Sequence, residues 1–332
     1  MNRKNLLVVL LILLFVISLI ISLILGGTPV SIKEIWYSVV HPDVSQTIST
    51  IIYRIRLPRI IAGVCIGAGL SVCGCVLQAI LRNPLAEPYT LGISGGASLG
   101  ATIAVVLNFA NFFGIFWLPI ATFLGAFISV STIYLIASKR QFSTHILILI
   151  GVILSFVFSS IVMFVFAIAK PQEIYTAIFW LMGDLSSVEH TLLSLIVPLI
   201  TLGVTAIFLF NRELDIITLG EEKAHYTGLN VEKTKKILFV ITSIVTAVCV
   251  SSSGIIGFVG LIVPHFIRYF VTGPKHKFLI PVSAISGAIF LILCDTLART
   301  IIAPVELPVG VITGILGGMF FLTFFLRQKT II

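Results

Sequence analysis

Apolar runs of about 20 residues recur along the whole sequence, and they restrict the possible fold more than any other feature. A helix of that length matches the ~30 Å hydrocarbon thickness of a bilayer. Ten such runs can be delimited, at 6–26, 59–81, 91–108, 118–138, 144–168, 190–210, 236–252, 255–271, 278–297 and 308–326. No polar stretch between them is long enough for a separate domain. We therefore expect residues 1–332 to form one all-α, polytopic membrane domain with about ten transmembrane helices.

Basic residues divide unevenly between the two sides that ten spans define. An even number of spans puts both termini on one side, and fifteen of the 21 Lys and Arg residues fall on that side. Because Lys and Arg collect on cytoplasmic loops, we expect both termini to be cytoplasmic. The apolar run after Arg3 and Lys4 is too long for a typical signal peptide, and no small-residue cleavage site follows it. We therefore assign it to the first span.

Three of the basic residues on the opposite side lie in one short stretch, "YRIRLPR", which contains Arg54, Arg56 and Arg59. Pro58 stiffens this stretch, and Arg299 is the other basic residue near a span end on that side. In one interpretation, the arginines extend to the membrane interface while their stems stay in apolar surroundings. We favour a site for an acidic partner, because complementary charge steers and orients a docking protein.

Residues 211–236, "NRELDIITLGEEKAHYTGLNVEKTKK", form a polar island in a chain in which 58% of the residues are hydrophobic. The island holds ten of the 34 charged side chains. Thr218 and Glu221 match the S/T-x-x-E capping box, and Glu222 adds a second negative charge to the first turn. This pattern predicts a helix over 219–227.

The predicted helix is expected to end at Gly228, because glycine readily adopts the left-handed conformation that stops a helix. Asn230 can then cap a second short helix, which leads through Lys235 and Lys236 into the next span. A solvated loop is the alternative. Because long disordered loops do not usually carry two sets of helix caps, we favour a compact docking element.

Glycines recur in several spans, where small residues let helix backbones approach closely. The run "GISGGASLG" (92–100) is denser in glycine than packing requires. Two interpretations remain for Ser94, Gly95 and Gly96. They pack against a neighbouring helix, or they line a path as an unwound segment that exposes its backbone.

Patterns typical of catalytic or metal-binding sites are absent from the sequence. It has no GxxxxGK[ST] motif, its six His lack metal-ligand spacing, and its five Cys lie in apolar runs without a CxxC pair. No Asp, Glu, Lys or Arg lies near the centre of a span, where ion-coupled carriers usually keep such groups. We therefore expect no catalytic residue and no metal or cofactor on this chain. If it moves a solute, the energy enters through a partner.

Six motifs together resemble the FecCD family, the permease subunits of type II ATP-binding-cassette (ABC) importers for ferric siderophores, haem and vitamin B12. The motifs are "RLPR" (56–59), "NPLAEPYTLGISGGASLG" (83–100), "LGEEKAHYTGLN" (219–230), "GIIGFVGLIVPHFIR" (254–268), "DTLAR" (295–299) and "ELPVGVITGILGGMFF" (306–321). Each motif is weak alone, but they agree in order, spacing and predicted side over nearly the whole chain.

The resemblance implies ten helices that work as a pair in the bacterial inner or plasma membrane. The second member of the pair would be another permease copy or a paralogue, with the path between the two. Two cytoplasmic ATPase subunits would bind ATP and Mg²⁺, and an extracytoplasmic binding protein would deliver the substrate. The expected function is import of an iron(III)–siderophore complex, with haem or cobalamin as alternatives by the same mechanism.

The resemblance also implies roles for individual residues. Arg56, Arg59 and Arg299 would meet acidic residues of the binding protein, whereas Arg54 has no assigned counterpart. The coupling helices that enter the ATPase cleft would contain Glu221, Glu222, His225 and Gly228. The gate or pathway positions would be Asn83, Leu85, Ser94, Gly95, Gly96, Ser143 and Thr144. Residues 174–185 would form a short outer helix that helps to close the external gate.

Two other functions fit the same composition. The chain could be a membrane scaffold or receptor that signals through the polar island without moving a solute. It could also be a secondary carrier driven by an ion gradient. Accumulation that depends on ATP distinguishes the importer from both.

Overall fold

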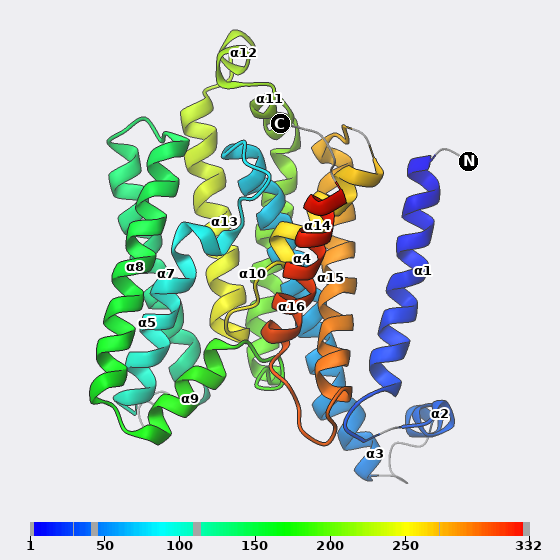
Figure 1. Cartoon of the computed structure of the whole chain (residues 1–332). Helices are drawn as coiled ribbons and strands as arrows, with labels where there is room; N and C mark the ends of the chain where they lie inside the picture. The colour runs from blue at the N-terminus through cyan, green and yellow to red at the C-terminus, as the bar shows by residue number, and fades with distance from the viewer. Residues whose placement is uncertain (1–2, 29, 41–45, 109–113, 272, 328–332) are drawn as a thin grey trace.

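Helices make up nearly all of the described chain in this computed structural model, and no strand occurs among the described residues. The structure describes residues 3–28, 30–40, 46–108, 114–271 and 273–327. The long helices stand side by side as a bundle (Figure 1). The all-α fold expected from the sequence is confirmed.

Seven helical segments are long and apolar enough to cross a bilayer. They contain α1 (Arg3–Ile24), α4 (Leu57–Ile80), α7 (Trp117–Ser138), α8 (Thr144–Ile168), α10 (His190–Leu209), α13 (Val231–Ser253) and α15 (His276–Thr300). Three shorter apolar helices lie where the sequence predicts the remaining spans: α5 (Ile93–Val106), α14 (Val259–Phe270) and α16 (Val309–Arg327). Every expected span therefore contains a helix.

Short helices lie at the two ends of the bundle (Figure 1). One end carries α2 (Ile32–Val40), α3 (Gln46–Thr50) and α9 (Pro171–Leu181), and we label it the outer end after the side that the sequence predicts for it. The other carries α11 (Asn211–Thr218) and α12 (Glu221–Tyr226), and by the same prediction we label it the inner end. The start of α1 and the end of α16 both lie at the inner end. A helix was expected over 174–185, and α9 is that helix, shifted by a few residues.

The central helix of the bundle is α4, most of whose residues are buried. It is surrounded by α10, α13, α14 and α15. Gly67 of α4 faces Gly287 of α15, and Gly74 faces Gly260 of α14. A Cβ atom at any of these four glycines would approach the facing backbone too closely. Glycine at these positions therefore sets how tightly the core helices pack, as small residues do in membrane bundles.

The glycine-rich run at 92–100 is helical, so the unwound alternative is wrong. After Gly92, which has φ of +78°, α5 begins at Ile93 and continues through the whole run. Gly96 and Gly100 lie against the backbone of α7, where a Cβ atom would collide. Gly92 and Gly95 face α8, so close packing of this segment on α7 and α8 explains the density of glycine.

Candidate functional site

Three of the four arginines near the outer end are buried inside the chain. Arg56 ends a π-helical turn, η1 (Ile51–Arg56), which runs directly into α4, and Arg59 lies in the first turn of α4. Arg299 lies in the last turn of α15. Arg54, in contrast, is exposed.

Two carboxylates compensate part of this buried charge. Nε of Arg59 donates a hydrogen bond to Asp295 at 2.8 Å, and its Nη1 donates to Glu306 at 2.6 Å. Nε of Arg299 lies 3.1 Å from the second oxygen of Asp295. The Asp295 side chain is 3% exposed and that of Glu306 is 43% exposed. Asp295 therefore bridges two arginines away from water, where charge attraction is strong.

The end of α1 covers the other guanidinium groups. Arg56 donates to three backbone carbonyls at or just after the C-terminus of α1, and Nη2 of Arg299 donates to Oγ of Ser22 at 2.8 Å. The last carbonyls of a helix lack partners within it and attract cations. We name the outer arginine cluster by its members, Arg56, Arg59, Arg299, Asp295 and Glu306. It has one more positive than negative side chain.

The polar island forms two short helices before the span, and its predicted capping box is wrong. Thr218 ends α11, and its hydroxyl donates to the carbonyl of Asp215 at 2.7 Å. The chain turns at Gly220, which has φ of +112° and takes the N-cap position of α12. Gly220, not Thr218, is therefore the N-cap of α12, and no side chain caps this helix.

Gly228 and Asn230 have the local roles that the sequence predicts. Gly228 follows α12 with φ of +80°, and the Asn230 side chain accepts a hydrogen bond from the backbone N–H of Lys233 at 3.0 Å. The helix that Asn230 caps is not short, however. It is α13, which runs unbroken from Val231 to Ser253, so part of the island and a membrane span form one rigid element.

A small core and one ion pair hold the island together. Ile217, Ala224 and Val231 pack as a cluster that joins α11, α12 and α13. Nζ of Lys235, which is buried, lies 2.5 Å from Oε1 of Glu221. The hydrogen bond from Lys235 lowers the pKa of the Glu221 carboxyl. The island is therefore a folded element, as expected, rather than a solvated loop.

The outward face of α12 is polar with one aromatic ring at its tip. Glu222, His225 and Gly228 are exposed, and Tyr226 is 91% exposed. Aromatic residues are enriched at protein interfaces, which makes Tyr226 a contact candidate that sequence reasoning missed. The sequence did offer a signal for Tyr226, because it directly follows His225 inside the segment predicted to dock with the ATPase.

The predicted gate residues lie in two turns at the inner end (Figure 1). Oδ1 of Asn83 accepts a hydrogen bond from the N–H of Leu85 at 2.9 Å, and Leu85 is exposed. Ser143 precedes α8 and Thr144 begins it, with the Thr144 hydroxyl buried and without a hydrogen-bond partner. The structure thus puts these four residues on the same end as α12, and their gating role stays a prediction.

Ser94 and Gly95 lie at the start of α5, close to α8. The Ser94 hydroxyl donates to the carbonyl of Tyr89 at 3.4 Å, and Gly95 packs against Phe158 of α8. Both are half-buried, while Gly96 is buried against α7. Their expected contribution to a pathway stays a prediction.

Two of the sequence motifs meet where the loop before α5 touches the loop before α14. The Glu87 carboxylate accepts a hydrogen bond from the N–H of Phe258, and the Tyr89 hydroxyl accepts one from the N–H of Ile256, each at 3.2 Å. Burial raises the pKa of Glu87 to about 6. On the other side of the same loop, the N–H of Asp184 donates to the carbonyl of Ser253 at 2.8 Å. The segment after α9 and the loop before α5 therefore both contact the connection between α13 and α14.

A further contact that sequence reasoning missed joins α11 to the start of α15. Oδ1 of Asp215 accepts a hydrogen bond from the backbone N–H of His276 at 2.8 Å and lies 2.6 Å from its Nδ1. No local pattern could link two residues this far apart in the sequence. Asp295, in contrast, stands four residues before Arg299, a spacing at which helical charges pair.

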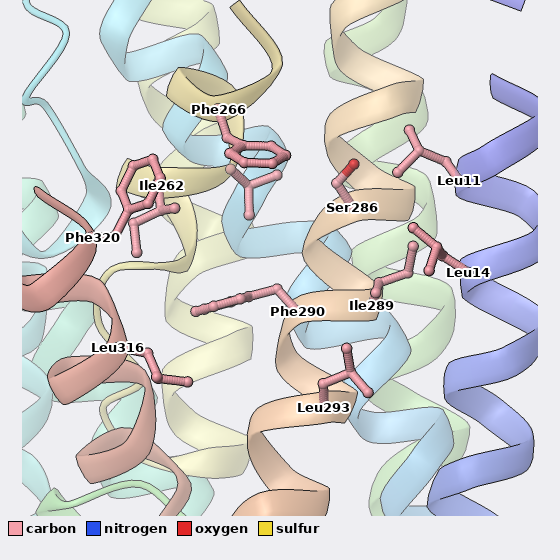
Figure 2. Close-up of a pocket in the computed structure, with 11 residues that line it drawn as sticks. Leu11, Leu14, Ile262, Phe266, Ser286, Ile289, Phe290, Leu293, Leu316 and Phe320 are labelled. Carbon is pink, nitrogen blue, oxygen red and sulfur yellow. The ribbon is translucent and has the colours of Figure 1, made fainter. Parts of the chain in front are cut away.

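An apolar groove of about 370 Å³ opens between α1, α14, α15 and α16 (Figure 2). Leu14 of α1, Phe290 of α15 and Phe320 of α16 face it. Ser286 supplies the one hydroxyl group among its described lining residues. The groove therefore lacks the convergent polar groups with which a site orients a polar ligand.

Comparison with known proteins gives a consistent result. The model of the FecCD transport family matches residues 13–327. A cobalamin import system permease protein of Halobacterium salinarum is 39% identical over 308 residues, covering 92% of this chain and 81% of that protein. An iron(3+)-hydroxamate import system permease protein of Bacillus subtilis is 35% identical over 284 residues, covering 84% of each chain.

A solved structure agrees with these sequence relatives. It shows an inward-facing conformation of an ABC transporter of the metal-chelate type. It matches this chain with a TM-score of 0.85 at 30% identity, covering 96% of this chain and 98% of that one. The chain therefore belongs to the FecCD transport family, and it has the fold of an ABC importer permease.

Proposed function

We propose that this chain is the membrane subunit of an importer that carries an iron(III)–siderophore complex into the cytoplasm. The observation that carries the proposal is the family match over residues 13–327, on a chain that presents a folded polar element at one end of the bundle. The hydroxamate permease relative and the metal-chelate type of the matching structure favour an iron chelate.

In this proposal the inner end faces the cytoplasm, together with both termini. Two ATPase subunits bind there, and the exposed face of α12 with Glu222, His225 and Tyr226 enters a cleft on each. ATP and Mg²⁺ act in those subunits, while this chain binds no cofactor. Because α13 continues from the island into the membrane without a break, a displacement of α12 reaches the helix bundle.

The outer end receives the substrate-binding protein. Arg54 is exposed and offers a first contact for acidic side chains. Arg56, Arg59 and Arg299 are buried, so a partner carboxylate reaches them only after Glu306 or the end of α1 moves aside. The substrate then passes between two permease copies, or between this chain and a paralogue, and α9 closes the path from outside.

Cobalamin is the second candidate substrate, favoured by the cobalamin permease relative at 39% identity. Haem import by the same mechanism is a third. A scaffold or receptor that moves no solute is the alternative of a different class. The same fold suits all four candidate functions, so transport has to be measured directly.

The test is uptake into proteoliposomes that contain the permease and its ATPase, with the binding protein outside and ATP inside. Radiolabelled ferric hydroxamate, cobalamin and haem are supplied separately. We expect accumulation of the ferric hydroxamate, and no accumulation with an ATPase variant that cannot hydrolyse ATP. Accumulation of cobalamin or haem alone would identify that compound as the substrate in place of the iron complex. Accumulation of none of the three would favour the scaffold or receptor function.

A further inference from the structure

Charged side chains fasten α15 at both of its ends, and its middle is packed tightly against the central helix. At the inner end, hydrogen bonds join its first residue to α11 in the polar island. At the outer end, an ion pair joins it to Arg59 in the outer arginine cluster. The helix therefore connects the two surfaces at which the proposed partners would bind.

The inner fastening is the contact between Asp215 and His276. The Asp215 carboxylate accepts from the backbone N–H and lies 2.6 Å from Nδ1 of His276, the first residue of α15. A carboxylate at this position also complements the positive end of the helix dipole. A cavity of about 520 Å³ lies beside the contact, lined by Thr218, Arg268 and Lys275 among others. Asp215 and His276 themselves belong to its lining, so the contact lies at the edge of an open space and is not enclosed by other side chains.

The middle of α15 cannot slide easily along α4. Gly67 and Gly287 bring the two backbones into direct contact, and the Ser71 hydroxyl donates to the carbonyl of Ser283 at 2.9 Å. Close-packed interfaces of this kind shift between discrete arrangements rather than deforming continuously. We therefore expect α4 and α15 to move together.

The outer fastening is Asp295, which bridges Arg59 of α4 and Arg299 of α15. Glu306, the more exposed carboxylate, occupies the remaining side of Arg59. A change of partner at Arg59 therefore acts on both helices at once.

We propose that Asp215 and His276 are a positioning pair that transmits conformational change between the polar island and α15. The pair touches neither the substrate nor ATP. It ties the movement of α11, at the ATPase side, to α4 and α15, whose other ends hold the outer arginine cluster. This inference rests on the proposed function, because it needs an ATPase and a binding protein at the two ends.

The test measures how strongly the docked binding protein stimulates ATP hydrolysis by the complete transporter. Asp215→Ala and His276→Ala are each expected to reduce this stimulation about fivefold or more, the usual range for coupling between distant sites. Hydrolysis without binding protein is measured for each variant as its own baseline and should fall much less than the stimulated rate. The double variant should lose no more than either single variant. Lys139→Gln, an exposed change on the turn between α7 and α8, is the matched control and should behave as wild type.

The exchanged variant, Asp215→His with His276→Asp, separates a specific pair from two unrelated structural residues. We expect it to recover part of the stimulation that each alanine variant loses. Wild-type stimulation in the alanine variants would overturn the inference. So would a folded exchanged variant without recovery, or an equal loss of hydrolysis with and without binding protein.

A measurement on the wild-type transporter keeps the inference testable if these variants do not fold. Amide hydrogen exchange is followed over 211–218 and 276–280 before and after the binding protein docks. We expect both segments to change together, and docking that leaves both unchanged would overturn the inference. Failure of the wild-type transporter to accumulate substrate with ATP would instead contradict the proposed function.

Discussion

At the scale of single residues, Asp295 is much the more buried of the two carboxylates in the outer arginine cluster. Its side chain is buried between Arg59 and Arg299, so its loss leaves two buried cations without their common partner. Breaking a buried ion pair on one side costs about 3–5 kcal/mol, whereas an exposed pair contributes about 0–1 kcal/mol. The side chain of Glu306 is 43% exposed, so its ion pair with Arg59 resembles an exposed pair more than a buried one.

Asp295→Asn is therefore expected to lower the free energy of unfolding by about 3–5 kcal/mol, and Glu306→Gln by about 1 kcal/mol or less. Thermal unfolding of the purified chain in lipid nanodiscs measures the difference, with Arg54→Gln as the exposed control. Equal losses of unfolding free energy in the two variants would show that burial of the carboxylate does not determine how much it stabilises the chain.

Glu87 gives a prediction that depends on pH. Burial raises the pKa of its carboxyl to about 6, from a reference value of 4.5. Between these two pH values the folded chain keeps a proton that the unfolded chain has lost. The free energy of unfolding therefore falls as pH rises through this window, by the linkage of proton binding to folding.

Glu87→Gln removes this titration and keeps an oxygen that can accept from the N–H of Phe258. The unfolding temperature of the variant should change less than that of wild type between pH 4.5 and pH 6. At pH 7 the variant should be at least as stable as wild type. Parallel pH curves for the two proteins would contradict the assignment.

The sequence indicated where the arginines lie but not what they touch. A cluster of Arg54, Arg56 and Arg59 was evident from spacing alone. The partner of Arg59 is 236 residues away in the sequence, and only the packing of α15 on α4 brings Asp295 to it. Burial of the cluster could not be predicted either, because it depends on the end of α1 folding back over it.

At the scale of helical elements, the island should depend on the backbone conformation of Gly228. Its φ of +80° is incompatible with proline, and its N–H donates to the carbonyl of His225 at 3.0 Å. Asparagine tolerates the left-handed region, so Gly228→Asn is the matched control. The residue is exposed and a Cβ added to it would meet no atom within 4 Å, so the strain of the proline variant comes from the backbone and not from neighbouring side chains.

Gly228→Pro should reduce ATP-dependent uptake about tenfold or more, a factor that corresponds to about 1.4 kcal/mol of coupling. The unfolding temperature of the membrane bundle should stay near that of wild type, and Gly228→Asn should retain most of the uptake. Normal uptake in the proline variant would count against the island as the coupling element.

The contact of α4 with α14 makes a second prediction for elements. A Cβ at Gly74 would overlap the backbone of Gly260, while a Cβ at Gly314 of α16 meets no atom within 4 Å. Gly74→Ala should therefore destabilise the bundle by about 1–3 kcal/mol or more, and Gly314→Ala should stay within about 0.5 kcal/mol of wild type. Thermal unfolding of both variants checks this, and tolerance of Gly74→Ala would contradict the close approach.

Helix caps show what local patterns can and cannot predict. Asn230 and Gly228 were identified correctly because each acts on its own neighbours. Thr218 fitted the capping-box pattern but lies inside α11, since the pattern takes no account of the turn that Gly220 provides. The apolar helices were located within a few residues, because each forms a continuous apolar run bounded by polar residues or glycine.

At the scale of the whole molecule, the sequence predicted where the ten apolar helices lie along the chain but not how they are arranged in space. Nothing local indicates that α4 is the centre of the bundle, apart from its regular glycines. The junction of Glu87 and Tyr89 with the loop before α14 is likewise a product of the three-dimensional fold. The polar island and the outer arginines could be found from the charge pattern of the sequence. Their connection through α15 is visible only in the structure.

The central claim is that this chain is passive and that ATP hydrolysis in a partner powers transport. The most direct measurement supplies proteoliposomes containing the complete transporter with either ATP or an imposed proton or sodium gradient, and follows labelled ferric siderophore. The account predicts accumulation with ATP and binding protein together, and none with an ion gradient alone. Accumulation driven by an ion gradient in the absence of ATP would contradict it.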